Sequence, residues 1–91
     1  MSLRVIWTEP ARDSLRKLDR GVSWQVIEAV ERLAEAGHGD FAHLRPPETG
    51  FRLRVRDWRV FLDTDKAART ITVHRVEHRS KAYKRLRRRT T

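Results

Sequence analysis

The fold is decided by residues 50–63, Gly50-Phe-Arg-Leu-Arg-Val-Arg-Asp-Trp-Arg-Val-Phe-Leu-Asp63. Apolar and basic residues alternate along most of this stretch, with the period of two that is typical of a β-strand. A tight turn at Arg56-Asp57 would join two strands into an antiparallel hairpin, although neither turn residue is the glycine that such turns favour. The hairpin then presents one apolar side to a core and one arginine-rich side to solvent.

Two helices are predicted before the hairpin, after a short alternating strand at residues 3–7. Thr8 offers a side-chain oxygen as the cap of a first helix, which we expect to run to about Asp19 and to end at Gly21. Ser23 is placed to cap a second helix, which carries one apolar stripe and stops at Gly37. The stripe consists of Val26, Ile27, Val30, Leu33 and Ala34. The two helices are expected to form a hairpin of their own.

The remaining residues complete an α+β domain. Residues 38–50, which contain prolines and glycines, predict a loop, and the β-branched residues of 70–76 predict a last strand. The resulting order is β-α-α-β-β-β, with the helical hairpin packed on a small antiparallel sheet. We therefore expect one domain over residues 1–91, which ends in a basic tail at about 84–91.

The chain carries a net charge of +9, and the excess lies in its second half. Residues 1–44 hold six Lys and Arg against seven Asp and Glu, whereas residues 45–91 hold fifteen against five. This asymmetry predicts a polyanionic partner, and nucleic acid is favoured over a membrane because no long apolar helical face accompanies the charge. Cysteines are absent, which excludes disulfides and thiolate metal sites. With no signal-peptide pattern and no long apolar run, we expect a cytoplasmic protein.

The predicted hairpin gathers three arginines on one side of the sheet. With a two-residue turn, Arg54 lies opposite Arg59, and Arg52 follows on the same face. Directly opposed like charges destabilise an antiparallel pair, and neither strand supplies a carboxylate to this face. The pattern favours an anion bound among the guanidinium groups. A solvated outer sheet face is the alternative.

A second group of candidate residues lies at the end of the last strand: His74, Arg75, His78, Arg79, Lys81 and Tyr83. A histidine can act as general acid or base near neutral pH, and a tyrosine can stack on a nucleobase. A spacing of four between histidines suits metal ligands on a helix but not on a strand, so we expect neither a metal nor a cofactor. Trp24 and Trp58 are interpreted as packing residues. The tail from Lys84 onward is expected to add salt-dependent affinity.

At these residues the chain resembles the RelE/ParE toxin superfamily. The stretch 50–63 is similar to the strand pair of that superfamily, with its glycine, its basic-apolar alternation and its aromatic residue followed by arginine. Residues 76–83 are similar to the closing pattern, in which a His-Arg pair precedes a tyrosine. The opening strand, the Pro10-Ala11 dipeptide and the helical hairpin agree as well, so the resemblance covers nearly the whole chain.

The resemblance implies a type II toxin that a cognate antitoxin neutralises in a hetero-oligomer. RelE-like members enter the ribosomal A site and cut mRNA without a metal, because a 2′-hydroxyl attacks the adjacent phosphate and leaves a cyclic phosphate. Carried onto this chain, the resemblance implies catalytic roles for Arg52, Arg54, Arg59, Arg79 and Tyr83. Further RNA contacts are expected from Arg56, His74, Arg75, Lys81, Lys84 and Arg85.

The chain departs from the RelE-like pattern at Arg52 and Arg54. RelE-like sites often carry lysines there, and one of them is proposed to take the hydroxyl proton. Arginine is a poor general base, because its guanidinium group stays protonated in proteins. Either His78 or His74 would take that role, or catalysis would be positional and electrostatic. Two alternatives to a nuclease are a ParE-like inhibitor of DNA gyrase and a non-toxic basic nucleic-acid-binding module.

Overall fold

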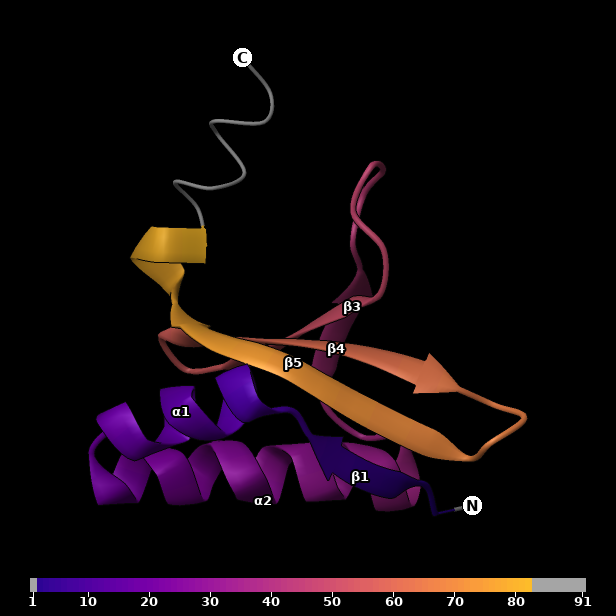
Figure 1. Ribbon diagram of the computed structural model, residues 1–91, viewed down its shortest axis with the longest axis horizontal. Helices are drawn as coiled ribbons and strands as arrows, with labels where there is room; N and C mark the ends of the chain where they lie inside the picture. The colour runs from indigo at the N-terminus through magenta and orange to yellow at the C-terminus, as the bar shows by residue number, and fades with distance from the viewer. Residues whose placement is uncertain (1, 83–91) are drawn as a thin grey trace.

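Residues 2–82 are the part of the chain that the computed structural model describes, and they form two helices and a five-stranded sheet (Figure 1). In chain order the elements are β1 (Arg4–Trp7), α1 (Glu9–Lys17), α2 (Arg20–Ala36), β2 (Asp40–His43), β3 (Phe51–Val55), β4 (Trp58–Asp65) and β5 (Thr70–His78). A helical turn follows β5 at residues 79–82. The predicted α+β class, with a helical hairpin against a sheet, is confirmed.

The sheet is mixed rather than wholly antiparallel. Its strand order is β1-β5-β4-β3-β2, and β1 runs parallel to β5 while the other three pairs are antiparallel. Alternation within residues 3–7 predicts a strand but not the direction of its neighbour. A parallel pair needs a long crossover connection, which the two helices provide. Thr8 then ties the end of β1 to β5, because its Oγ1 donates to the carbonyl of Val73 at 3.0 Å.

Strand β2 lies within the segment that the sequence predicts to be a loop. All four of its residues are exposed, so no alternation of burial marks them as a strand. The strand forms by backbone pairing with β3, from Asp40 opposite Arg54 to His43 opposite Phe51. It is the last strand at one edge of the sheet, where pairing on a single side suffices.

The boundary between the two helices lies earlier in the chain than predicted. Helix α1 stops at Lys17, and the Asp19 carboxylate caps α2 by accepting from the Gly21 N–H at 3.1 Å. Gly21 and Ser23 therefore lie in the first turn of α2, where the Ser23 hydroxyl donates to the Leu15 carbonyl. The predicted cap at Thr8 and the predicted stop at Gly37 (φ 71°) are confirmed. In the described residues, no helix is long and apolar enough to cross a membrane.

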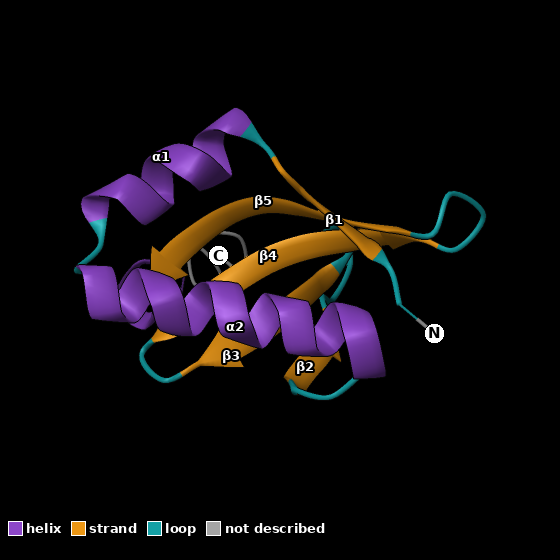
Figure 2. Cartoon of the chain, turned by 90° about the horizontal axis from the view of Figure 1, so that it is seen from below, coloured by secondary structure: helices purple, strands orange, loops and turns teal. Residues whose placement is uncertain are grey.

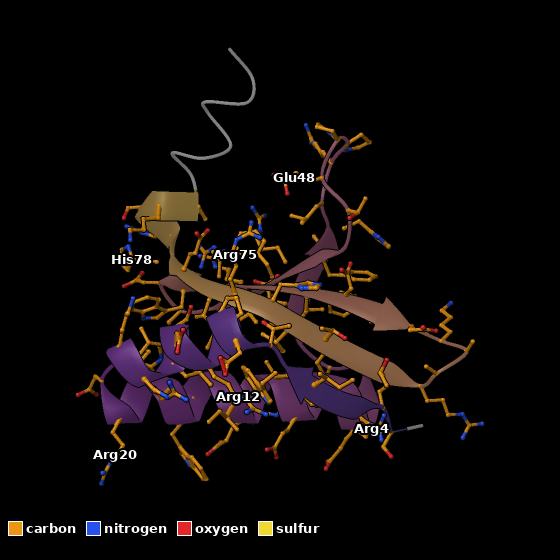
Figure 3. All side chains as sticks on the ribbon, viewed as in Figure 1. Arg4, Arg12, Arg20, Glu48, Arg75 and His78 are labelled. Atoms are coloured by element: carbon orange, nitrogen blue, oxygen red, sulfur yellow. The ribbon has the colours of Figure 1, made fainter. Side chains whose placement is uncertain are left out.

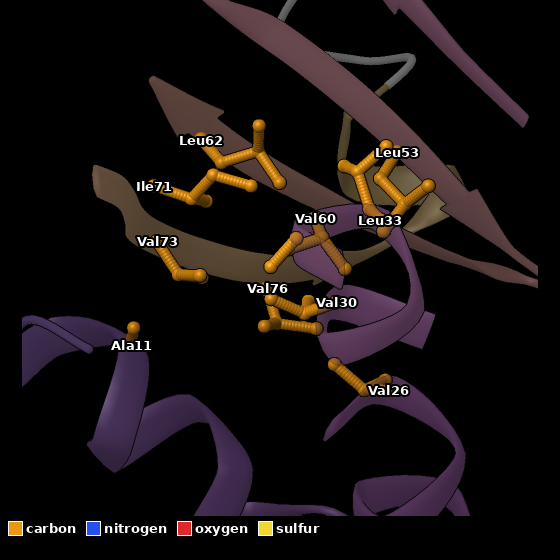
Figure 4. Packing of buried hydrophobic residues seen from close by; sticks show 11 residues of the cluster. Ala11, Val26, Val30, Leu33, Leu53, Val60, Leu62, Ile71, Val73 and Val76 are labelled. Atoms are coloured by element: carbon orange, nitrogen blue, oxygen red, sulfur yellow. The ribbon is translucent and has the colours of Figure 1, made fainter. Parts of the chain in front are cut away.

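Both helices cover the same face of the sheet (Figure 2). The stripe of α2 packs against apolar residues of β3, β4 and β5 in a single core, which Figure 4 shows from close by. Ile27 of that stripe is half-buried, whereas its other four members are buried. Trp58 packs against the core as expected, but Trp24 is 62% exposed, so its interpretation as a packing residue is wrong. The position of Trp24 at the edge of the stripe turns its ring to solvent. Within residues 2–82, the helices leave the opposite face of the sheet uncovered.

Candidate nucleic-acid interface

The β3–β4 hairpin has the register that its sequence predicts. Val55 and Trp58 flank a two-residue turn, and Arg54 faces Arg59 across the two strands. Arg56 takes a φ of 55° in this turn, so an arginine in the left-handed backbone region forms the turn without a glycine. The prediction that the two arginines share one face is thereby confirmed.

Three strands build the outer face, which we define as the side of the sheet turned away from α1 and α2. The residues on this side are identified by the pairing of β3, β4 and β5, and they lie outside the apolar core. Two rows cross the strands: Arg52, Phe61 and Arg75 in one, and Arg54, Arg59 and Glu77 in the next. Figure 3 shows Arg75 on this side, opposite Arg12 of α1. The face is therefore dominated by guanidinium groups.

Arg59 lies at the centre of what we call the cationic cluster, which comprises Arg52, Arg54, Arg59 and Arg79. Burial lowers the pKa of Arg59, and the charges of Arg54, Arg52 and Arg79 lower it further. Its Nη1 donates to the carbonyls of Arg56 at 2.8 Å and Trp58 at 2.9 Å, which fixes the head group at the turn. An anion placed among these side chains would relieve their mutual repulsion.

Arg79 reaches the cluster because the chain turns into a helix directly after β5. Its backbone N–H donates to the Asp57 carbonyl at 2.7 Å. Its Nε lies 3.8 Å from the Asp57 carboxylate, with both side chains largely exposed. The hairpin turn thus holds the start of the helical turn in place. Such an exposed ion pair contributes little stability and leaves the guanidinium group accessible.

A charged pair on the same face was not predicted from the sequence. Glu77 lies opposite Arg59, and its Oε1 is 3.5 Å from Nε of Arg75. The Arg75 guanidinium also stacks over the ring of Phe61, 4.0 Å from its centroid. Alternation along β5 would have placed Glu77 and Arg75 on one side. Only the pairing of β5 with β4 brings that side next to the arginines.

His74 is brought to the outer face and paired with a carboxylate. Its Nε2 lies 2.6 Å from Oδ2 of Asp63, and both side chains are nearly half exposed. His78, by contrast, lies opposite Trp58, and the two rings meet edge to face at 5.2 Å. Its Nδ1 contacts the Ser80 hydroxyl at 3.0 Å. The strand alternation therefore separates His78 from the cationic cluster.

The remaining candidate residues lie partly beside the cationic cluster and partly outside the described residues. Arg56 and Lys81 are exposed beside the cluster, in the hairpin turn and in the helical turn. Tyr83, Lys84 and Arg85 lie outside the described residues. Within residues 2–82 there is no group of three or more His, Asp or Glu side chains placed to hold a metal ion. The guanidinium and imidazole groups of the described residues are chemically suited to bind and polarise a phosphate.

Known proteins share this architecture. Residues 5–83 match the family described as the ParE toxin of the type II toxin-antitoxin system, parDE. No curated protein matches the chain. Among solved structures, the RelBE2 toxin-antitoxin complex from Mycobacterium tuberculosis is similar with a TM-score of 0.77 and 28% identity, over 87% of this chain and 100% of that one. The archaeal RelE-RelB complex from Pyrococcus horikoshii has a TM-score of 0.75 and 18% identity, over 89% and 99% of the two chains.

A free-state mutant of Escherichia coli toxin RelE is similar as well, with a TM-score of 0.68 and 20% identity over the full length of both chains. The family match spans β1 to the helical turn after β5, and thus includes the whole hairpin and its arginines. The chain therefore belongs to the ParE toxin family of type II toxin-antitoxin systems, within the RelE/ParE superfamily.

Proposed function

We propose that this toxin is a ribosome-dependent endoribonuclease. It enters the A site and cuts mRNA without a metal, by attack of a ribose 2′-hydroxyl on the adjacent phosphate. The observation that carries the proposal is the cationic cluster on an open sheet face, where Arg54 and Arg59 stand opposite each other. The phosphate gains negative charge as the fifth oxygen approaches, and fixed positive groups stabilise that charge more than the ground state.

Within the cluster, Arg59 is suited to the role of central phosphate ligand. Its head group is already fixed by two carbonyls, so less side-chain entropy is lost when the phosphate binds. Arg52, Arg54 and Arg79 lie close enough to lower its pKa, which places several charges around one phosphate. Arg75 and the residues after the helical turn, Tyr83 among them, would contact the flanking nucleotides.

A cognate antitoxin is the expected protein partner, in a hetero-oligomer formed in the cytoplasm. Two of the similar solved structures are complexes of a RelE-type toxin with its antitoxin. An antitoxin with an acidic segment would suit the cationic cluster, because complementary charges steer association and suppress other partners. Covering this cluster would exclude RNA.

A second candidate function is inhibition of DNA gyrase. The family that the sequence matches is described as the ParE toxin, and arginines occupy positions 52 and 54 where nuclease relatives often carry lysines. A gyrase inhibitor needs no proton transfer. This alternative predicts DNA damage and filamentation without cleavage of mRNA.

Induced expression of the wild-type chain and of Arg59→Ala in bacterial cells separates these functions. We expect rapid loss of translation and new mRNA 5′ ends in ribosome-bound messages, detected by primer extension. The Arg59→Ala variant should lose cleavage by about 100-fold or more while it still binds the antitoxin. The matched control is Lys66→Ala, which removes an exposed cation from the β4–β5 turn.

The other outcomes of this experiment point to a different function or a different site. Filamentation with DNA damage and intact mRNA would support the gyrase alternative. Normal growth with the wild-type chain would contradict both toxin functions. Undiminished cleavage by Arg59→Ala would show that the site lies elsewhere.

A further inference from the structure

A β-bulge puts two consecutive side chains of β5, those of His74 and Arg75, on the outer face. Phe61 pairs with Arg75, but the next residue of β4, Leu62, pairs with Val73, so His74 is an extra residue in β5. Oγ1 of Thr8 lies 3.1 Å from the His74 carbonyl and 3.0 Å from the Val73 carbonyl, so its one proton is shared between two residues of the bulge and ties it to the β1–α1 connection. Bulges of this kind re-aim a side chain and are frequent beside active sites.

The imidazole ring of His74 is held by a carboxylate from the neighbouring strand, β4. His74 Nε2 lies 2.6 Å from Asp63 Oδ2, a distance at which one proton is shared in a strong charge-assisted hydrogen bond. With the Nε2 proton donated to Asp63, the second ring nitrogen, Nδ1, is left as an acceptor. In residues 2–82 the ring of His74 makes this one hydrogen bond. The side chain is 45% exposed, so Nδ1 is the ring nitrogen available to accept a substrate proton.

Gly50, before β3 on the side of β4 away from β5, leaves space for the Asp63 carboxylate. It lies just before β3 with a φ of 93°, and a Cβ at this position would overlap the Asp63 carboxylate and the Leu62 carbonyl. The carboxylate thus occupies space that any other residue at position 50 would fill. Three segments, the residue before β3, β4 and the β5 bulge, are shaped around one carboxylate–imidazole pair.

The pair also lies next to the cationic cluster. Asp63 is two residues beyond Phe61 on β4, and His74 directly precedes Arg75 on β5, so the pair borders the row of Arg52, Phe61 and Arg75. Strands β3 and β5 lie on either side of β4 and are therefore about 9.6 Å apart, two strand spacings, so their side chains can flank one phosphodiester. His78, whose ring packs on Trp58, lacks this placement.

We propose that His74 is the general base of RNA cleavage and that Asp63 is its positioning residue, an assignment that rests on the proposed function. Nδ1 of His74 removes the proton of the 2′-hydroxyl, and the 2′-oxygen forms a bond to phosphorus. The bond from phosphorus to the 5′-oxygen breaks, and this leaving oxygen takes a proton from water. The products are a 2′,3′-cyclic phosphate and a 5′-hydroxyl, while Asp63 stabilises the imidazolium ion until it loses its proton to solvent.

Single-turnover cleavage of a model mRNA on purified ribosomes tests this assignment. Removal of a general base costs about 10²–10⁴-fold in rate, so His74→Gln should cut at least 100-fold more slowly and bind ribosomes as the wild-type chain does. Asp63→Asn should give a smaller loss. Added imidazole should restore part of the activity of His74→Ala, which a merely structural histidine would not allow. The matched control is His38→Gln, at an exposed position before β2.

The dependence of the rate on pH gives a further readout. A general base acts only in its unprotonated form, so the wild-type rate should fall in acid and His74→Gln should lose this dependence on pH. The charged groups that face His74 are Asp63 from β4, Arg75 from its own strand and Arg52 from the row beside it. The contribution of Asp63 to the pH profile is tested by the Asp63→Asn variant.

Failure of this assignment is distinguishable from failure of the proposed function. If the wild-type chain cuts no ribosome-bound mRNA, the nuclease function itself is wrong. If the wild-type chain cuts, and Arg59→Ala is impaired, while His74→Gln keeps the wild-type rate and pH profile, then the assignment of the base is overturned. Loss of ribosome binding or of thermal stability by His74→Gln, without imidazole rescue of His74→Ala, would overturn it as well.

Discussion

Arg54 and Arg59 stand directly opposite each other in the β3–β4 pair, on the side of the sheet that the helices leave open. After burial, the charge of Arg54 is the largest cause of the lowered pKa of Arg59. The fold thus keeps two guanidinium groups at a distance where they repel. Local rules of sheet stability are broken mainly at functional sites, which favours a functional role for this pair.

The repulsion itself can be measured by replacing Arg54 with a neutral strand-forming residue. Arg54→Thr should raise the free energy of unfolding by about 0.2–1 kcal/mol, because a like-charge pair is removed. The same variant should bind RNA more weakly and with a smaller dependence on salt. Urea denaturation and fluorescence anisotropy at several salt concentrations measure the two effects. Arg45→Thr, in the exposed loop before β3, is the control with the same loss of charge, and a less stable Arg54→Thr would contradict the repulsion.

Glu77 is expected to stabilise the outer face. Its side chain is 11% exposed and lies beside Arg75 and opposite Arg59. Glu77→Gln keeps the shape but removes the negative charge, so the free energy of unfolding should fall by about 1–3 kcal/mol. Affinity for RNA should rise through the added net charge. Glu31→Gln, on the exposed side of α2, makes the same change in net charge and should leave stability nearly unchanged; equal effects of the two variants would argue against a specific role for Glu77.

Gly50 should tolerate no side chain. Both its φ of 93° and the overlap of a Cβ with Asp63 oppose a substitution, so Gly50→Ala should lower the free energy of unfolding by roughly 2–5 kcal/mol. Gly37→Ala is the matched control, since Gly37 also has a positive φ but has open space around it. Its expected loss is about 1 kcal/mol. Thermal melting followed by circular dichroism compares them, and a loss no greater than that of Gly37→Ala would contradict the close approach.

Trp24 should contribute little to stability despite its size. Its side chain is 62% exposed on α2, so Trp24→Ala should change the free energy of unfolding by about 0.5 kcal/mol or less. Trp58→Ala removes a ring that packs against the core and should cost about 2–4 kcal/mol. Urea titrations of the two variants give the comparison. A large loss for Trp24→Ala would mean that this ring is covered in solution.

Local patterns in the sequence were sufficient for much of the fold. The alternation in residues 50–63 predicts both strands, their turn and the pairing of Arg54 with Arg59. The cap at Thr8 and the stop at Gly37 are also local, because a cap depends on a few neighbouring residues. The boundary between the helices was missed, because Asp19, Gly21 and Ser23 are all suited to interrupt or cap a helix. Which of these residues ends the first helix and which caps the second depends on how α1 packs.

For the site, the sequence alone determined which residues of the hairpin share a face, since alternation within one strand follows from its geometry. Only the tertiary structure decided what lies beside them. The parallel placement of β1, the edge strand β2, the approach of Glu77 to Arg59 and the bulge at His74 all depend on backbone pairing between segments far apart in the chain. One extra residue in β5 puts His74 and Arg75 on the same outer face, while His78 stays on the other side with Trp58. No period in the sequence records that shift, because register is a property of two strands and not of one.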